Sequence, residues 1–149
     1  TADAAAAQPL TRELVSQLLQ DSLGLSAWKD TGFDRWPLRC NPSSGNLHPT
    51  EAYVIVGAAE DLAPGVYHYN PLEHALECRL EIGSELLPIY QASFLPPGLW
   101  IDFTSIFWRE SWKYGERALR YCNHDVGHAI ASVAGCPYPP ILDMVRELE

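Results

Sequence analysis

The sequence predicts an α+β fold, in which a mixed, mainly antiparallel sheet packs against two amphipathic helices. Short apolar runs rich in β-branched residues occur near residues 52, 66, 76 and 99 and predict the strands. Segments with helical spacing precede and follow these runs, from Arg12 and from Gly115. Turn residues separate the runs near 66 and 76, which indicates a hairpin.

Length and composition place the chain among globular proteins. Its 149 residues amount to one domain, and 47% are hydrophobic while 19% are charged, a composition far from that of a disordered protein. The first residues are alanine-rich, so residues 1–8 are expected to form a flexible segment before a single domain over 9–149.

Charge and cysteine usage exclude several functions. A net charge of -9 argues against a nucleic-acid or anionic-membrane surface, which would need a basic face. No apolar stretch is long enough to span a bilayer and no signal peptide is evident, so a cytoplasmic location is expected. The four cysteines form no CxxC pair, so reduced thiols are expected rather than a metal site.

The first half of the chain contains one clear helix. Leu14, Val15 and Leu18 recur at helical spacing, Thr11 can cap the start and Gly24 can follow the end, so we predict a helix over 12–23. Residues 25–38 mix Trp28, Phe33 and Trp36 with charged side chains. This irregular pattern favours a packed loop anchored by its aromatic rings.

The expected strands cover residues 52–56, 66–69, 75–80 and 99–103. The first is uniformly apolar and is expected to be buried on both faces. A short helix is expected over 86–92 with Pro88 in its first turn, and residues 106–108 are expected to extend the apolar wall beyond the last strand.

The clearest helix begins at Gly115. Its expected apolar stripe consists of Ala118, Leu119, Cys122, Val126, Ala129, Ile130 and Val133. The proline-rich segment 136–140 ends this helix, and residues 141–148 are expected to form a short terminal helix.

The loop before the first strand concentrates polar groups. Pro42-Ser43-Ser44-Gly45-Asn46-Leu47-His48-Pro49, here called the signature loop, contains two adjacent hydroxyls, a glycine and an amide between two prolines. Such a loop can direct several hydrogen-bonding groups at one planar ligand. The same composition also suits an ordinary turn, and the residues alone leave both interpretations open.

The signature loop and the following Glu51-Ala52-Tyr53-Val54-Ile55-Val56 resemble the flavin-dependent nitroreductase-like superfamily. The resemblance implies a homodimer that binds FMN, with cofactor contacts from five residues: Arg39, Pro42, Ser43, Ser44 and Asn46. Many members of the family have glutamine at the position of His48, for which a neutral imidazole hydrogen-bonded within the fold is the alternative to a flavin contact.

A second match lies at the start of the long helix. Lys113-Tyr114-Gly115-Glu116-Arg117, together with Gly65-Val66-Tyr67-His68-Tyr69, is similar to the azoline dehydrogenase branch, whose FMN enzymes oxidise thiazoline and oxazoline rings in peptides. The resemblance implies that Lys113 and Tyr114 are catalytic, because this oxidation needs a base for a carbon-bound proton. The alternative is a basic helix entrance followed by a core tyrosine.

His124 and His128 stand one helical turn apart with Asp125 after the first. A zinc site of the HEXXH type needs a glutamate directly after the first histidine and a third ligand, so no metal is expected. Hydrogen bonding within a dimer or towards the signature loop is the preferred interpretation.

The resemblance covers residues 10–134 and omits two family features. Residues 1–8 contain no basic side chain for the FMN phosphate, and the strands that follow the long helix in the family are not found, so we expect an incomplete copy of the fold. The predicted function is FMN-dependent oxidoreduction of the azoline dehydrogenase type. The alternatives are a generic nitroreductase or NAD(P)H-flavin oxidoreductase, and a cofactor-free module that binds a peptide or a modifying-enzyme partner.

Overall fold

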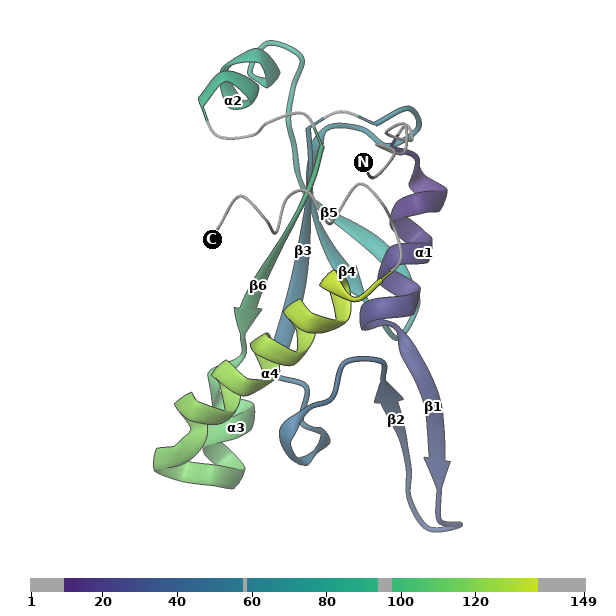
Figure 1. Cartoon of the computed structure of the whole chain (residues 1–149), viewed down its shortest axis with the longest axis vertical. Helices are drawn as coiled ribbons and strands as arrows, with labels where there is room; N and C mark the ends of the chain where they lie inside the picture. The colour runs from purple at the N-terminus through teal and green to yellow at the C-terminus, as the bar shows by residue number, and fades with distance from the viewer. Residues whose placement is uncertain (1–9, 58, 94–97, 137–149) are drawn as a thin grey trace, which may run out of the picture.

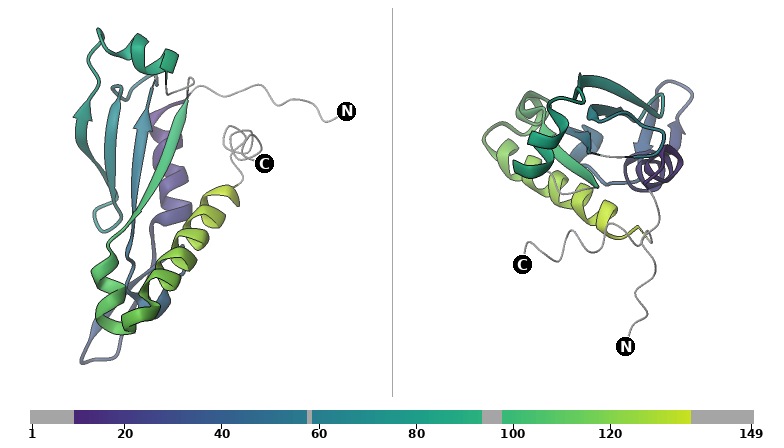
Figure 2. Two further views of the ribbon diagram at one scale, coloured as in Figure 1. Left: turned by 90° about the vertical axis from the view of Figure 1, so that its left-hand side faces the viewer. Right: turned by 90° about the horizontal axis from the view of Figure 1, so that it is seen from above.

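The structure is a computed structural model that describes residues 10–57, 59–93 and 98–136. A four-stranded sheet carries helices α1 and α4 on one face, and a separate two-stranded hairpin extends beyond the end of α1 (Figure 1). The two further views show the same layering, with both helices on one side of the strands (Figure 2). The predicted α+β fold with an antiparallel sheet against two helices is confirmed.

Helix α1 (Arg12–Leu23) has the predicted bounds. The Thr11 hydroxyl accepts a hydrogen bond from the Leu14 amide at 3.2 Å, which satisfies one of the free amides of the first turn. Val15, Leu18, Leu19 and Leu23 are buried and pack into the core. The helix therefore forms because its apolar stripe and its cap agree.

The sheet has the order β5-β4-β3-β6, and its described pairings are all antiparallel. Its strands are β3 (Thr50–Val56), β4 (Gly65–Asn70), β5 (Ala75–Glu81) and β6 (Leu99–Ser105). Val54 lies opposite both Tyr67 and Ile101. The predicted hairpin of β4 and β5 is confirmed.

Strand β3 is buried on one face, so the expectation of burial on both faces was wrong. Thr50, Ala52, Val54 and Val56 are buried, whereas the residues between them are half-buried. The reason is that α1 and α4 cover only one face of the sheet.

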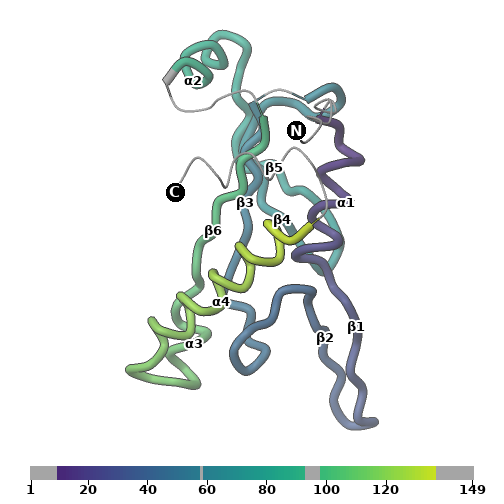
Figure 3. The backbone as a smooth tube through the Cα atoms, viewed as in Figure 1, coloured from purple at the N-terminus to yellow at the C-terminus, as the bar shows by residue number. Residues whose placement is uncertain are grey.

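The segment expected to be a packed loop is instead a hairpin of β1 (Leu25–Asp30) and β2 (Arg35–Arg39). Its turn is held by the Gly32 amide, which donates to Asp30 Oδ1 at 2.7 Å with Gly32 at φ 82°. The Arg35 guanidinium lies 4.5 Å from the centre of the Trp28 ring, and Phe33 is 98% exposed. These aromatic side chains do not anchor the segment in the core, and the hairpin projects away from the four-stranded sheet (Figure 3).

Helix α2 (Leu87–Ser93) confirms the predicted short helix, with Pro88 in its first turn. Residues 106–108 were expected to extend the apolar wall, but Phe107 begins helix α3 (Phe107–Tyr114). Phe107 is 49% exposed and Trp108 is 68% exposed, so the expected apolar wall does not continue past β6.

Helix α4 (Ala118–Ala134) follows a 3₁₀ turn over Gly115–Arg117. Its buried stripe consists of Ala118, Cys122, Asp125, Ala129 and Val133. Leu119 and Ile130, predicted to be on that stripe, are 63% and 48% exposed because they lie on the outer side of the helix. The predicted segments 1–8, 137–140 and 141–148 lie outside the described residues.

The described residues contain neither of two features that would indicate a function. None of the described helices has the length and apolar character required to cross a membrane. Among the same residues, no cluster of three or more histidine, cysteine, aspartate or glutamate side chains could hold a metal ion. The four cysteines are free thiols.

Candidate functional site

The signature loop is a tight turn with an unusual backbone. Ser44–Asn46 form a 3₁₀ turn, and Gly45, Asn46 and His48 have positive φ values of 63°, 58° and 47°. Glycine adopts this region without strain, and asparagine and histidine are enriched there among other residues. The residue types of the loop therefore suit its sharp path from β2 to β3.

Asp125 of α4 holds both serines of the loop. The Ser43 hydroxyl donates to one carboxylate oxygen at 2.6 Å. The Ser44 amide and hydroxyl donate to the other oxygen at 2.9 and 3.0 Å. Asp125 is 1% exposed, so these bonds take the place of the water that a buried carboxylate loses. Asp125 is thus the residue that fixes the loop to the helix layer.

Asn46 and His48 complete an internal network. The Asn46 amide nitrogen donates to the Pro37 carbonyl at 3.0 Å, and its oxygen lies 2.9 Å from His48 Nε2. The His48 amide donates to the Ser43 hydroxyl oxygen at 2.8 Å. Burial, helped by the nearby Arg39 charge, lowers the pKa of His48 to about 4, so the ring is neutral at neutral pH. The interpretation of His48 as a neutral imidazole within the fold agrees with this geometry.

Arg39 lies beneath the loop, where its Nη1 donates to the Thr50 carbonyl at 3.3 Å. Burial lowers the pKa of Arg39, an effect opposed by the charge of Glu51. Arg109 of α3 lies nearby and donates to the His48 carbonyl at 2.7 Å and to Glu51 Oε1 at 3.1 Å. Sequence reasoning missed Arg109, because nothing in its local pattern indicates a contact 61 residues away.

A small cavity of about 10 Å³ adjoins Arg39. Asn41 Oδ1 and Thr50 Oγ1 are buried and have no hydrogen-bond partner within the described part of the chain, and both residues line the cavity. A space of this size with polar partners suits one water molecule.

The end of α3 approaches the signature loop from the other side. The Lys113 ammonium lies 3.4 Å from the Gly45 carbonyl oxygen. A Cβ placed at Gly45 would lie 2.5 Å from the Tyr114 hydroxyl and 2.6 Å from Lys113 Nζ. Tyr114 packs against Tyr121 with ring centres 4.2 Å apart. The residues of the two resemblance motifs therefore meet at Gly45.

Glu110 is a second buried acid at this site, and its importance was not predicted. It is fully buried, and neither carboxyl oxygen has a hydrogen-bond partner among the residues described. Burial raises the pKa of Glu110, and the nearby Asp125 raises it further while Lys113 opposes the shift. The sequence offered one indication, since Glu110 lies one helical turn before the predicted Lys113.

His124 and His128 do not reach the signature loop, and hydrogen bonding of these residues within a dimer stays a prediction. Both are exposed, and His124 makes an edge contact with Tyr121 at 6.2 Å between ring centres. The residue that reaches the signature loop is Asp125, which lies on the buried stripe of α4. An acid at an apolar position of the helical pattern was the indication that sequence analysis could have used.

The residues present fit a planar polar ligand in part. Lys113 and Tyr114 place an ammonium and a hydroxyl beside Gly45, whose missing side chain permits close approach. The Ser43 and Ser44 hydroxyls donate to Asp125, so each retains only acceptor capacity towards a ligand. Arg39 is directed at Thr50. Flavin contacts from Arg39, Pro42, Ser43, Ser44 and Asn46, and catalysis by Lys113 and Tyr114, stay predictions.

The chain is similar in sequence to proteins that have been named. No protein-family model matches the chain. The "Trifolitoxin-processing protein TfxB" of Rhizobium leguminosarum bv. trifolii is 38% identical over 61% of this chain and 27% of its own length. The "Putative nitroreductase MJ1384" of Methanocaldococcus jannaschii is 30% identical over 84% of this chain and 62% of its own length. The chain thus spans less than two thirds of either relative.

Solved structures share the fold. A crystal structure of a "putative nitroreductase" from Anabaena variabilis matches 81% of this chain and 26% of its own, with a TM-score of 0.68 and 31% identity. The E. coli microcin synthetase McbBCD complex with truncated pro-MccB17 bound matches 97% of this chain and 56% of its own, with a TM-score of 0.66. At 18% identity, this second likeness shows the fold alone.

These similarities confirm the resemblance seen in the signature loop and at Lys113-Tyr114. One sequence relative is named as a nitroreductase and another as a peptide-toxin processing protein, which agrees with the predicted superfamily and with its azoline dehydrogenase branch. By sequence and by fold, the chain belongs to the nitroreductase-like superfamily.

Proposed function

We propose that the protein catalyses an FMN-dependent oxidation of the azoline dehydrogenase type. In this reaction, thiazoline or oxazoline rings of a peptide are oxidised to thiazole or oxazole. The observation that carries this proposal is the meeting of Lys113 and Tyr114 with Gly45 of the signature loop. These residues come from two motifs 68 positions apart, each of which resembles the family in sequence. The name of one sequence relative, the trifolitoxin-processing protein TfxB, supports a role in processing a precursor, whereas the McbBCD likeness supports the fold alone.

In this proposal Lys113 is the base. Its amine, in the neutral form, accepts the proton that leaves a ring carbon of the azoline. The Tyr114 hydroxyl also lies at Gly45, where it would position the substrate ring beside the lysine. FMN, when bound, supplies the acceptor for the hydride that leaves the adjacent ring atom.

The loop residues would hold the flavin ring. The Ser43 and Ser44 hydroxyl oxygens, whose hydrogens go to Asp125, can accept a hydrogen bond from a ring N–H group. Pro42 and Asn46 keep the loop in its turn, the latter through Pro37 and His48. Arg39, half-buried and directed at the Thr50 carbonyl, would act on the flavin through its charge rather than by direct contact.

A homodimer would complete the site. Phe107, Trp108 and Trp112 of α3 are 49%, 68% and 78% exposed, and Leu119 and Ile130 expose the outer side of α4. Apolar surface of this kind on neighbouring helices marks an interaction site. We assign it to a second copy of the chain, as the resemblance implies.

A flavin titration tests the proposal. FMN added to the purified protein should give a shifted visible spectrum and quenched flavin fluorescence. Lys113→Ala should retain flavin but lose oxidation of an azoline-containing peptide by about a hundredfold, the usual contribution of a general base. Lys29→Ala, at an exposed position of the β1–β2 hairpin, is the matched control and should retain full activity. Equal activity of both variants would remove Lys113 from the mechanism.

A cofactor-free interaction module is the second candidate. It is favoured by the hydrogen bonds that the serine hydroxyls give to Asp125 and by the hydrogen bond from Arg39 to the Thr50 carbonyl, which leave few free donors near the loop. An unchanged FMN spectrum at saturating concentration, together with retained binding of the precursor peptide, would support this module. Reduction of nitroaromatic compounds by NADPH without azoline oxidation would instead support a generic nitroreductase.

A further inference from the structure

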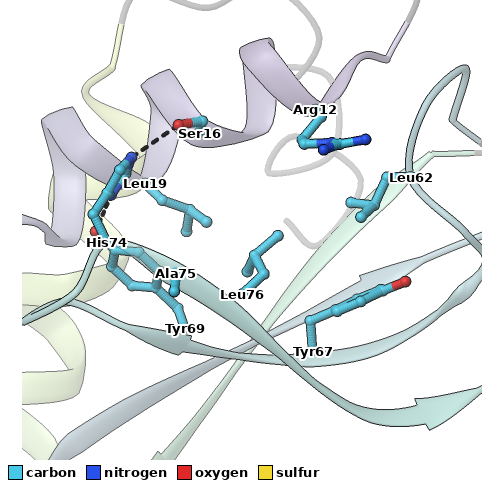
Figure 4. A pocket seen from close by; sticks show the side chains of 9 residues that line it. All are labelled: Arg12, Ser16, Leu19, Leu62, Tyr67, Tyr69, His74, Ala75 and Leu76. Atoms are coloured by element: carbon cyan, nitrogen blue, oxygen red, sulfur yellow. Dashed lines mark hydrogen bonds between the residues drawn. The ribbon is translucent and has the colours of Figure 1, made fainter.

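A second pocket lies between α1 and the β4–β5 hairpin, on different elements from the signature loop. It has a volume of about 270 Å³, close to the lower end of the range for small-molecule sites. Figure 4 shows the side chains that line it: Arg12, Ser16, Leu19, Leu62, Tyr67, Tyr69, His74, Ala75 and Leu76. None of these residues was predicted to bind the flavin.

Most of the wall is apolar. Leu19, Leu62 and Leu76 face the pocket from the helix, a loop and strand β5, and the Tyr67 ring forms its floor (Figure 4). The Tyr67 hydroxyl donates to the Ala63 carbonyl at 2.7 Å, so this ring contributes an apolar face rather than a polar group. A pocket lined by leucine side chains and the face of a tyrosine ring suits an aromatic ring.

One end of the pocket carries a chain of hydrogen-bonded polar groups. Ser16 Oγ lies 2.8 Å from His74 Nε2, and His74 Nδ1 lies 2.9 Å from the Tyr69 hydroxyl. His74 has a positive φ of 49° and follows a turn held by the Asn70 side chain, which accepts the Leu72 amide at 3.1 Å. Because either histidine tautomer satisfies both neighbours, the chain can offer a donor or an acceptor to a ligand.

The opposite end does not favour an anion. Arg12 Nη2 donates to the Asp61 carbonyl at 2.8 Å, and Arg12 Nε lies 3.9 Å from Asp61 Oδ2, so the carboxylate already neutralises the guanidinium. The net charge of -9 opposes anions further. A partly neutralised guanidinium can still lie over an aromatic ring.

We propose that this pocket is a second ligand site, for a neutral aromatic compound that carries one hydroxyl group. The ring packs among Leu19, Leu62, Leu76 and the Tyr67 face, and the hydroxyl hydrogen-bonds to Ser16 in the Ser16–His74–Tyr69 chain. The ligand is a free small phenol rather than a peptide tyrosine, because the pocket volume of about 270 Å³ lies at the lower end of the range for small-molecule sites.

The experiment compares four probes by NMR titration of the folded chain. 4-Methylphenol should shift the methyl signals of Leu19, Leu62 and Leu76 and bind about fivefold more tightly than toluene, which lacks the hydrogen bond. 4-Methylbenzoate should bind more weakly than 4-methylphenol. Equal affinity for toluene and 4-methylphenol, or tighter binding of the benzoate, would overturn the proposal. Tighter binding of N-acetyltyrosinamide than of 4-methylphenol would overturn the assignment to a free compound.

Variants locate the site. Ser16→Ala should reduce 4-methylphenol affinity about fivefold and leave toluene affinity unchanged, whereas Ser26→Ala on the exposed β1 strand should change neither. Leu76→Trp should fill the pocket and abolish binding of both probes, with exposed Leu80→Trp on the same strand as its control. If Leu76→Trp fails to fold, the Ser16→Ala measurement decides alone. Unchanged 4-methylphenol affinity in Ser16→Ala would refute the hydroxyl contact.

Discussion

Helices α3 and α4 each bury one acidic side chain, and the two carboxyl groups differ in their hydrogen bonding. Asp125 of α4 accepts three hydrogen-bonding groups from Ser43 and Ser44. Glu110 of α3 is equally buried, yet neither of its oxygens has a partner among the described residues. Burial of an unpartnered carboxylate costs several kcal/mol, whereas a protonated acid costs much less. The acid of α4 is therefore satisfied by the signature loop, whereas the acid of α3 is not satisfied by any residue that the structure describes.

The outer surface of α3 carries exposed aromatic side chains. Trp108 and Trp112 of α3 are largely exposed, as large aromatic rings rarely are in a monomer that functions alone. The inner end of α3 nevertheless reaches the signature loop through Lys113. We infer that α4 fixes the loop, while α3 presents the candidate catalytic residues and the surface for a partner.

The largest effect is expected at Asp125. Asp125→Asn replaces one acceptor oxygen by a donor, so at least one of the three groups from Ser43 and Ser44 loses its partner. The free energy of unfolding, measured by urea denaturation, should fall by about 3 kcal/mol. Asp102→Asn, at an exposed position of β6, should change it by less than about 0.5 kcal/mol. Similar values for both variants would mean that Asp125 does not anchor the loop.

A smaller effect is expected where α3 meets the loop. Gly45 has φ 63°, and a Cβ there would lie 2.5 Å from the Tyr114 hydroxyl. Gly45→Ala should therefore lower the free energy of unfolding by about 1–2 kcal/mol through backbone strain and displace Lys113 and Tyr114 as well. Gly32→Ala has the same backbone cost at φ 82° but open space around the new Cβ.

The difference between these two glycine variants isolates the contact with α3. Azoline oxidation should be lost in Gly45→Ala and retained in Gly32→Ala, even where their unfolding free energies are similar. Retained oxidation in Gly45→Ala would separate Lys113 and Tyr114 from the loop in function.

Sequence analysis predicted correctly those elements whose signals lie close together in the sequence and all indicate the same structure. Helix α1 was predicted with its bounds because Thr11, the apolar stripe and Gly24 all indicate the same limits. The β4–β5 hairpin was found because its strands and turn residues are adjacent in sequence. Hairpin β1–β2 was missed because β1 is almost entirely exposed and β2 is mostly half-buried on both faces, so no alternation of buried and exposed residues marks either strand.

The candidate site could be predicted only in its motifs. The signature loop and Lys113-Tyr114 were found by resemblance, but their meeting at Gly45 depends on how α3 packs after β6. Arg109 and Glu110 were missed because Phe107 and Trp108 before them were interpreted as an extension of the apolar wall and not as the start of helix α3. Long-range partners such as Asp125 and Ser43, 82 residues apart, leave no local pattern.

Burial of Glu110 in α3 should make the free energy of unfolding depend on pH. Because the pKa of Glu110 is raised in the folded state above its ordinary value of 4.5, the folded chain holds a proton that the unfolded chain has released. The free energy of unfolding should therefore decrease as pH rises from 4.5 through the raised pKa, and then level off. Asp125 and Cys122 of α4 and Lys113 of α3 are the titratable groups near it.

Glu110→Gln removes this titration and should give a flatter stability profile than the wild type, with the larger gain at alkaline pH. The control is Glu116→Gln, at an exposed position of the 3₁₀ turn, which should follow the wild-type profile. Thermal unfolding of the three proteins between pH 4.5 and 9 provides the comparison. Parallel curves for wild type and Glu110→Gln would show that Glu110 titrates normally.

The smallest effect on folding is expected on the outside of α3. Trp108→Ser with Trp112→Ser removes two rings that are 68% and 78% exposed, so the unfolding free energy of a single chain should change by less than about 0.5 kcal/mol. If these rings bind a second copy, the double variant should nevertheless be monomeric by analytical ultracentrifugation at concentrations where the wild type is dimeric. Its thermal midpoint should also lose the concentration dependence that a dimer shows.

Phe33→Ser, at a 98% exposed ring on the β1–β2 hairpin, distinguishes a specific surface from general hydrophobicity, because it should leave the dimer intact. Loss of the dimer in Phe33→Ser but not in the tryptophan variant would place the interface on the hairpin and leave the exposed face of α3 to another partner.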